Sequence, residues 1–304
     1  MLESAVIGLR WLQFSGAVVL LGVPLFLLYG IRGCDGPDLR WGRPLLMVAA
    51  AVVGLATAAA LVAQTAVMAG SLSEAVKPST LTMMVTGTAL GMGLMIRAVL
   101  AFLVLVMVTG LRPGRISWGL TIAVGLVVIA SFAWTGHGAA TGGAAGLVHL
   151  TADIVHLIAA ALWLGALVAL TVLLMRRAAA DDPAIHRALR DFSGVGTIAV
   201  ALLVLTGLIN TGFLVGPSRI ASLGTGLYGQ LLIAKLILFA LMLALAAGNR
   251  FRQTPALGSL LSGGEDPAGV VARLRRDVVA ETLVGALLLG VVAWMGTLAP
   301  PSTL

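Results

Sequence analysis

The chain has 304 residues, of which 60% are hydrophobic and only 10% are charged, and its mean hydropathy is +1.08. This composition excludes a soluble domain of this size, because such a domain carries far more charge. The formal net charge is +7, but the cations are confined mostly to the connections between apolar segments, so we expect no nucleic-acid partner.

Eight apolar segments follow one another, and each has about the 20 residues that a helix needs to cross about 30 Å of hydrocarbon. They lie near residues 6–31, 45–70, 81–108, 116–136, 149–175, 194–215, 227–248 and 278–298. These segments are too long and too uniformly apolar for the strands of a membrane barrel. We therefore predict an all-α polytopic membrane protein with eight transmembrane helices embedded in a lipid bilayer.

Cations gather in the loops after the first, third, fifth and seventh predicted spans. These are Arg32, Arg40, Arg43, Arg112, Arg115, Arg176, Arg177, Arg187, Arg190, Arg250, Arg252, Arg273, Arg275 and Arg276. The opposite side holds Arg10, Lys77 and Arg219. Positively charged loops stay in the cytoplasm, so we expect both termini to face outward.

Segments of the second half repeat segments of the first half at corresponding depths of corresponding spans. There are three clear matches: Gln64–Gly70 with Asn210–Gly216, Gly91–Arg97 with Gly229–Lys235, and Ala133–Gly136 with Ala293–Gly296. A weaker match pairs Gly22 with Gly165. Each copy has an even number of spans, so both enter the membrane from the same side. We predict two parallel four-helix repeats, residues 1–136 and 137–304, related by an axis along the membrane normal.

Four ionisable residues lie inside the predicted spans, namely Arg97, Asp153, Lys235 and Glu281. Such residues are costly in a membrane and are usually functional or paired. Arg97, Lys235 and Glu281 are candidates for a buried charge network that fixes how the helices pack. The matched positions of Arg97 and Lys235 favour this structural interpretation.

A polar stripe lies at the start of the fifth predicted span. At 100° per residue, His149, Asp153, His156 and Trp163 fall within about 80° of arc on one helix face. His137 lies just before them, in a glycine-rich loop without cations. Neutral imidazole binds copper, zinc, nickel and iron, and Asp153 is a candidate ligand or an acceptor that orients an imidazole.

Simpler interpretations of these residues stay open. His137 and His149 are also compatible with interfacial residues that hold no ligand. On the third span, Met92 and Met95 share a helix face, and thioethers favour Cu(I), but methionine also packs readily in any apolar core. The chain has no nucleophile elbow, phosphate-binding glycine loop, Cys-x-x-Cys or His-Glu-x-x-His motif, so we do not expect an enzyme.

Several stretches of the second half are similar to one known family. The run Asp153-Ile-Val-His-Leu-Ile-Ala-Ala-Ala-Leu-Trp-Leu-Gly165 resembles the D-x-x-H…W-x-G signature of the copper resistance protein D family, and so do Thr206–Asn210, Tyr228–Lys235 and Asn249–Pro255. The resemblance covers most of residues 130–301, whereas the first half fits only in its pattern of spans. It implies a bacterial inner-membrane protein that moves copper from the periplasm to the cytoplasm, with a periplasmic copper-binding protein of the CopC type as partner.

Together these observations predict a copper transporter for Cu(I) or Cu(II). Copper would bind His137, His149 and His156, with Asp153 orienting an imidazole and Lys235 adjusting the charge. The ion would then pass between the halves along Met92 and Met95 toward Glu281. Two alternatives stay open: a b-type cytochrome, although we do not expect haem because only His156 lies well inside a span, and a scaffold or sensor that handles copper without transporting it.

Overall fold

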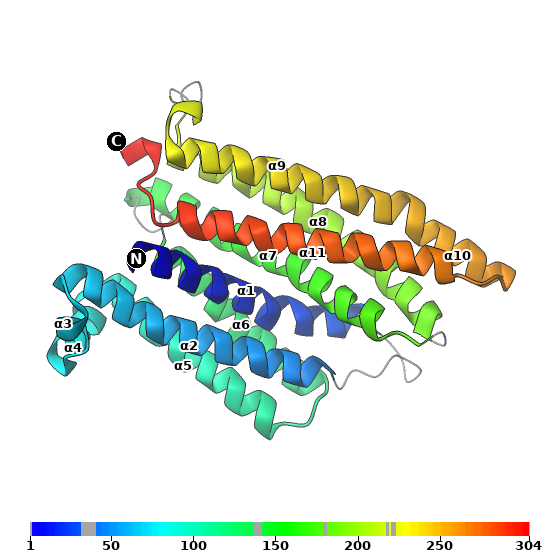
Figure 1. The fold of residues 1–304 in the computed structure, drawn as a ribbon, viewed down its shortest axis with the longest axis horizontal. Helices are drawn as coiled ribbons and strands as arrows, with labels where there is room; N and C mark the ends of the chain where they lie inside the picture. The colour runs from blue at the N-terminus through cyan, green and yellow to red at the C-terminus, as the bar shows by residue number, and fades with distance from the viewer. Residues whose placement is uncertain are drawn as a thin grey trace.

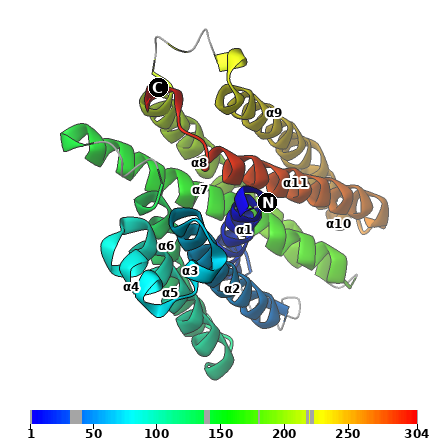
Figure 2. The same cartoon turned by 60° about the vertical axis from the view of Figure 1, so that its left-hand side comes forward.

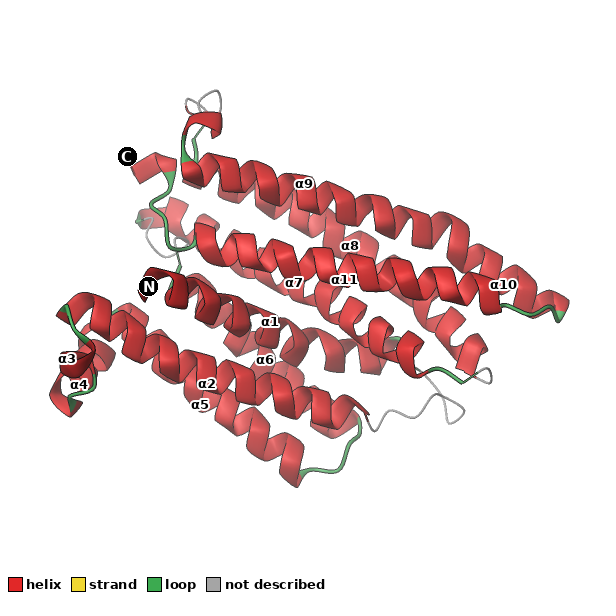
Figure 3. Ribbon diagram, viewed as in Figure 1, coloured by secondary structure: helices red, strands yellow, loops and turns green. Residues whose placement is uncertain are grey.

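The computed structural model is helical almost throughout the residues that it describes (Figure 3), which are 2–31, 41–136, 142–178, 181–216, 219 and 223–303. The long helices are α1 (Leu2–Tyr29), α2 (Gly42–Ala69), α5 (Ala89–Gly110), α6 (Arg115–Trp134), α7 (Gly143–Arg176), α8 (Asp182–Leu214), α9 (Leu227–Gly248) and α11 (Ala268–Met295). The shorter segments are α3 (Leu72–Ala75), α4 (Pro78–Gly87), the π-helical turn η5 (Asn249–Gln253), α10 (Thr254–Gly263) and the 3-10 turn η6 (Pro301–Thr303).

The eight long helices confirm the predicted class and the number of membrane spans. Within the described part of the chain, eight helical stretches are long and apolar enough to cross a membrane, the seventh of them running from Leu227 through α10. Large apolar side chains such as Leu55, Ile116 and Leu208 are exposed on their outer faces. Exposed apolar surface on this scale fits contact with lipid rather than with water.

The predicted third span, 81–108, is wrong at its start because the helix breaks at Thr88. The Thr88 hydroxyl donates to the Met84 carbonyl oxygen at 2.8 Å and accepts from the Gly91 amide at 2.9 Å, which ends α4 and caps α5. The Met84 carbonyl oxygen would lie 2.1 Å from a Cβ at Gly91, so only glycine fits this turn. The span therefore begins at Ala89.

The chain ends lie together at one end of the bundle, which we call the terminal end; α10 and the α5–α6 connection lie at the opposite end, which we call the far end (Figure 1). Helix α1 occupies the centre and packs against α2, α6, α7 and α11. In Figure 2, α2, α5 and α6 lie on one side of α1, and α9 and α11 lie on the other. The first and second halves of the chain therefore meet mainly along α1, α6, α7 and α11.

The closest approach between the halves is the crossing of α1 and α7 at Gly22 and Gly165. A Cβ added at Gly165 would lie 2.4 Å from the Gly22 Cα, and a Cβ added at Gly22 would lie 2.1 Å from the Ala161 carbonyl oxygen. Membrane helices have no hydrophobic driving force between them, so small residues that allow close backbone contact stabilise such crossings. This contact fixes α7 against the centre of the bundle.

Candidate functional site

A small cavity lies near the terminal end of the bundle, where α7, α8, α9 and α11 meet. Its volume is about 50 Å³, which is enough for an ion with one or two waters. It is lined by His156, Gly207, Asn210, Thr211, Leu214, Val215, Tyr228, Leu232, Lys235 and Met295. Because imidazole, amide, ammonium and thioether groups converge here inside an apolar bundle, the cavity is a candidate binding site.

His156 reaches this cavity from α7, and α8 fixes its ring. The ring Nδ1 lies 2.9 Å from the Thr206 hydroxyl oxygen, and that hydroxyl donates its one proton to the Leu202 carbonyl oxygen at 2.5 Å. With the hydroxyl proton donated to the Leu202 carbonyl oxygen, Nδ1 donates the ring proton to Thr206, and the lone pair lies on Nε2. A histidine fixed through one nitrogen with the other unprotonated is in the form that binds a metal ion.

Asp153 lies one helical turn before His156 and is joined to α8 through Asn210. The Asn210 side-chain amide donates to Asp153 Oδ1 at 3.4 Å, while Asn210 Oδ1 is buried and has no hydrogen-bond partner among the residues that the structure describes. The Lys235 ammonium is close enough to act electrostatically on both Asp153 and His156. Asp153 and Lys235 balance each other's charge, so the cavity offers an imidazole lone pair and an unsatisfied amide oxygen without excess charge.

The structure does not bring all three predicted histidine ligands into this cavity. His149 is buried on the same helix, but its ring stacks on Phe213 with the centroids 4.6 Å apart and the planes 6° apart. His137 lies outside the described residues. Among the residues that the structure does describe, no three His, Cys, Asp or Glu side chains are close enough together to hold a metal ion.

The cavity instead contains groups that the sequence did not single out as ligands. Met295 enters from α11 and Tyr228 from α9, and both line the cavity with His156. Asn210 was recognised as a repeat position and as part of a stretch that resembles the family, but not as a ligand. The sequence pattern of a single helix gives no signal for Met295, because it meets His156 only through the packing of α11 against α7 and α9.

Met92 and Met95 lie far from this cavity. Their side chains are 45% and 39% exposed on α5, and α5 packs against α2, α4 and α6 rather than against any helix of the second half. This position is contrary to the expected copper path between the halves. Both side chains lie on the exposed surface of α5, where an apolar thioether is compatible with lipid.

Arg97 is buried in the first half among neutral partners. Its guanidinium donates to Gln13 Oε1 at 2.6 Å, to the Ser131 hydroxyl at 3.0 Å and to the Thr135 hydroxyl at 3.1 Å, and it lies 3.6 Å from the centre of the Phe132 ring. These contacts tie α5 to α1 and α6. Arg97 therefore acts as a packing residue whose charge is stabilised by dipoles and an aromatic face.

Replacing Gln13 with leucine should test this assignment. The change leaves one guanidinium donor without its acceptor in a buried place, so we expect a loss of about 2–3 kcal/mol of stability. Thermal unfolding in detergent would measure it as a lower Tm. Gln230→Leu is the matched control, because Gln230 is exposed on α9 and makes one long bond to the Gly224 carbonyl oxygen; equal Tm losses in the two variants would contradict the packing role.

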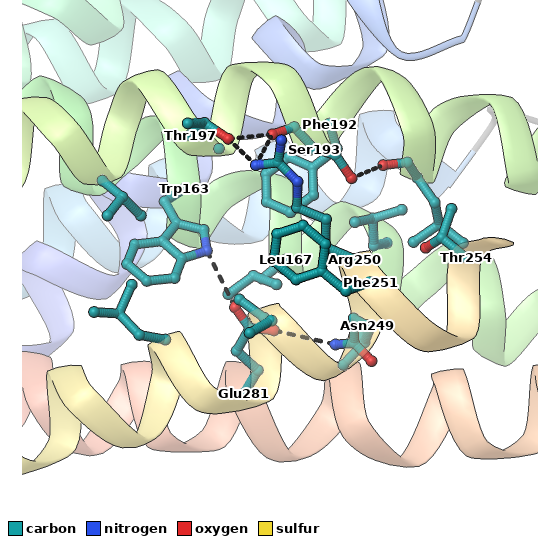
Figure 4. A pocket seen from close by; sticks show the side chains of 18 residues that line it. Trp163, Leu167, Phe192, Ser193, Thr197, Asn249, Arg250, Phe251, Thr254 and Glu281 are labelled. Atoms are coloured by element: carbon teal, nitrogen blue, oxygen red, sulfur yellow. Dashed lines mark hydrogen bonds between the residues drawn. The ribbon is translucent and has the colours of Figure 1, made fainter.

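A larger cavity, about 220 Å³ in volume, lies between α7, α8, α9 and α11 and extends toward the far end. Figure 4 shows Trp163 and Glu281 facing each other across it, with Asn249 on the other side of the carboxylate. The Trp163 indole donates to Glu281 Oε1 at 3.1 Å, and the Asn249 amide donates to Glu281 Oε2 at 3.3 Å. Arg250 closes this region toward α8 by donating to the Ser193 carbonyl oxygen and the Thr197 hydroxyl.

Arg97, Lys235 and Glu281 thus lie in three separate environments and do not form one charge network. Arg97 has neutral partners in the first half, Lys235 faces Asp153 and His156, and Glu281 accepts bonds from Trp163 and Asn249. The D-x-x-H…W-x-G stripe divides in the same way. Its aspartate and histidine lie at the small cavity, its tryptophan at the large one, and its glycine, Gly165, at the helix crossing.

Comparison with protein families gives two matches along this chain. Residues 1–147 match the family described as "Copper resistance protein D-like, N-terminal domain". Residues 186–295 match the family described as "Copper resistance protein D". The small cavity draws residues from the second of these regions and from α7, which precedes it.

Curated relatives from several bacteria are similar to the chain. "Copper resistance protein D" of Pseudomonas syringae pv. tomato is 35% identical over 97% of this chain and 96% of its own length. "Inner membrane protein YebZ" of Escherichia coli (strain K12) is 27% identical over 99% and 100%, and "Copper transport protein CutJ" of Bacillus subtilis (strain 168) is 28% identical over 78% and 44%. No solved structure matches the chain.

Proposed function

Because the chain belongs to the copper resistance protein D family and is a multi-pass inner-membrane protein, we propose that it transports copper ions across that membrane, from the periplasm to the cytoplasm. The observation that carries the proposal is the His156 cavity. It combines a histidine fixed as an Nδ1–H tautomer, an unpartnered amide oxygen and a methionine inside the bundle. Relatives are named as copper resistance or copper transport proteins, which fits an ion as the cargo.

In this proposal His156 Nε2 is the central copper ligand. Met295 supplies a sulfur atom for Cu(I), and Asn210 Oδ1 supplies an oxygen atom. Asp153 positions Asn210 and offsets the charge of Lys235. His149 and His137 belong to the same end of the bundle, and we propose that they take copper up before it reaches His156.

We infer the orientation in the membrane from the charge of the loops. Arginines gather at the far end, including Arg115, Arg250 and Arg276, so the far end faces the cytoplasm and the His156 cavity lies toward the periplasm. A cation that crosses a negative-inside membrane gains about 2.3 kcal/mol per charge for each 100 mV. The membrane potential therefore suffices to drive copper inward. A periplasmic copper-binding protein of the CopC type is the partner we propose for delivery at the terminal end.

We also propose that the halves are two parallel four-helix repeats. Gly91 and Gly229 begin matched helices, and neither leaves room for a Cβ against the preceding carbonyl oxygens of Met84 and Leu223. Gly70 and Gly216 end matched helices at φ values of 78° and 77°. Contacts of α1 with α2 and α6 are mirrored by contacts of α7 with α8 and α11.

The weak repeat match of Gly22 with Gly165 also identifies the residues of the first half that correspond to His156 and Asp153. Extending it toward the N terminus places Gln13 at the position of His156 and Arg10 at the position of Asp153, while Arg97 matches Lys235. In the first half, a fixed guanidinium contacts Gln13. The second half thus has an imidazole beside a small cavity where the first half has a guanidinium bonded to Gln13.

The size of the cavity disfavours the cytochrome alternative. A space of about 50 Å³ is several-fold smaller than the roughly 300–1,000 Å³ of sites for cofactor-sized ligands. His149, the nearest described histidine on α7, stacks on Phe213. We therefore retain copper transport, with copper handling without transport as the competing outcome of the test.

The first test is the copper content of the purified protein. We expect His156→Ala to retain at least about tenfold less copper than the wild type, because the ligand with its fixed lone pair is lost. His186→Ala is the matched control, since His186 lies on α8 against Gly258, in the part of the bundle near α10. Unchanged copper content in His156→Ala would contradict the site.

Sealed vesicles separate transport from copper handling. Wild-type protein should admit copper into the vesicle lumen, and His156→Ala should admit none above empty vesicles. Copper that binds to the wild-type protein but never enters the lumen would favour a scaffold or sensor over a transporter.

A further inference from the structure

The large cavity lies between α8 and α9, where these two helices do not pack against each other. Helix α8 packs against α7 and α9 packs against α11, but α8 and α9 make no extended contact with each other. In the proposed repeat their counterparts are α2 and α5, which pack closely along their length. The gap therefore distinguishes the second half from the first, and its walls include Leu189 to Val200 of α8 and Leu243 to Ala247 of α9.

Inside this gap a carboxylate and an amide oxygen border the same cavity, and the carboxylate forms no ion pair among the described residues. Glu281 is 1% exposed and accepts one hydrogen bond on each oxygen, so it is held as an acceptor on both sides. Asn249 lines the same cavity and is 8% exposed, and its Oδ1 has no hydrogen-bond partner. Two oxygens with free acceptor capacity thus border one cavity in the interior of the bundle.

The first half has no such group at the matched positions. The match of Ala133–Gly136 with Ala293–Gly296 places Thr121 opposite Glu281, and the match of Arg97 with Lys235 places Leu111 opposite Asn249. Thr121 is buried and donates to the Ser117 carbonyl oxygen, as an ordinary helix threonine does. The carboxylate is thus an addition to one copy, which is the distribution of a functional group rather than of a shared packing element.

The backbone that carries Asn249 is also irregular. Asn249–Gln253 forms the π-helical turn η5, where α9 continues into α10. Single π-helical turns in α-helices occur frequently at functional sites. This one directs Asn249 toward Glu281 and Arg250 toward α8.

We propose that Glu281, together with Asn249, is a proton-binding site of this protein. On protonation one carboxylate oxygen gains a hydrogen and becomes a donor, and a half-turn of the Asn249 amide presents Oδ1 as its acceptor. The carboxyl group gains one proton and loses one negative charge, and no other bond changes. The indole of Trp163 continues to donate to the other oxygen.

The oxygen atoms at this site are too few to hold a metal ion but are sufficient to bind a proton. Hard divalent cations take about six to eight oxygen ligands, and copper prefers nitrogen and sulfur. The cavity offers one carboxylate and one free amide oxygen, and the cationic Arg250 lines it and donates to the Thr197 hydroxyl. A proton needs no more than these two oxygens.

The charged groups around Glu281 are few. Arg250 lines the cavity from η5 but donates to α8. Asp277, one turn earlier on α11, accepts from Gln253 and from Arg276. The parts of α7, α8 and α9 that line the cavity contribute no titratable side chain.

This inference rests on the proposed function in one respect, which is that the proton is coupled to copper. Trp163 follows His156 by seven residues on α7, which is about 10 Å of helix. Over such a distance in a low-dielectric bundle, a cation at one site should weaken cation binding at the other by about tenfold. Copper at His156 should therefore release the proton from Glu281.

The proton site can be tested without copper by infrared titration of the purified protein. The wild type and Asp277→Asn should show the carboxylic acid band of Glu281 as the pH falls, and Glu281→Gln should lack it. Asp277→Asn is the matched control because it removes a carboxylate from the same helix outside the cavity. If Glu281→Gln shows the same band and midpoint as the wild type, the proposal is overturned.

Coupling is tested in sealed vesicles that contain the protein and a luminal pH indicator, with copper added outside. Copper uptake by the wild type should change the luminal pH, and Glu281→Gln should abolish most of that change because its side chain cannot take up or release a proton. If Glu281→Gln does not fold, Ala246→Phe, which adds a ring at a position that lines the cavity from α9, should also reduce the pH change. Copper uptake without any pH change in the wild type would overturn the coupling. If the protein takes up no copper but Glu281 still titrates, the proposed transport function is refuted and the proton-binding site is retained.

Discussion

Gly165→Leu is expected to prevent assembly of the bundle. A Cβ at this position would lie 2.4 Å from the Gly22 Cα and 2.8 Å from the Val18 carbonyl oxygen, so α1 and α7 would have to separate. Overpacking a core costs about 1–3 kcal/mol when side chains can shift, and more when the obstacle is backbone. We expect a loss of at least about 3 kcal/mol, which exceeds what a rotamer change can absorb.

The measurement is the yield of monodisperse protein by size-exclusion chromatography in detergent, together with its Tm. Gly119→Leu is the control, because Gly119 lies on α6 with no atom within 4 Å of a Cβ, and leucine there should even favour the helix. A Gly165→Leu protein with wild-type yield and Tm would mean that the α1–α7 crossing does not hold the halves together.

The class of fold follows from the sequence because hydropathy acts over whole segments. Each span must satisfy its backbone hydrogen bonds internally, so about 20 apolar residues predict a helix in almost any context. The break at Thr88 was missed for the same reason, since the apolar run continues through it. It depends on a local bond from Thr88 to the Met84 carbonyl oxygen and on the space that Gly91 leaves, and hydropathy records neither.

The candidate site was predictable where its residues share one helix or, as with Lys235 on α9, where an ionisable residue stands out inside a span. Asp153 and His156 follow one another at helical spacing on α7, so their common face could be seen in the sequence. Asn210 and Met295 come from α8 and α11, and their meeting with His156 depends on how those helices cross α7. His149 was predicted from the same helical spacing but does not line the cavity. The spacing determines on which face of α7 its Cβ lies, whereas the position of its ring depends on stacking against Phe213.

Lys235→Met is expected to bind copper more tightly than the wild type, by about tenfold or more. Two like charges on the order of 8 Å apart repel by about 2 kcal/mol at an effective dielectric constant of about 20. Removing the ammonium abolishes that repulsion and leaves Asp153 without the cation that acts on it, so the cavity gains net negative charge. Methionine has a similar length and lets the apolar part of the side chain keep its packing between α9 and α7.

Copper affinity can be measured by competition with a chelator of known affinity, with Lys77→Met as the control. Lys77 is also at the terminal end, but it is exposed and pairs with Glu74 at 2.6 Å, so its loss should leave copper affinity unchanged. The gain in affinity should appear as slower copper release into vesicles, because transport requires the ion to leave the site as well as to enter it. Lys235 would then be a residue that keeps binding weak enough for passage, and weaker copper binding in Lys235→Met would show instead that the ammonium positions the ligands.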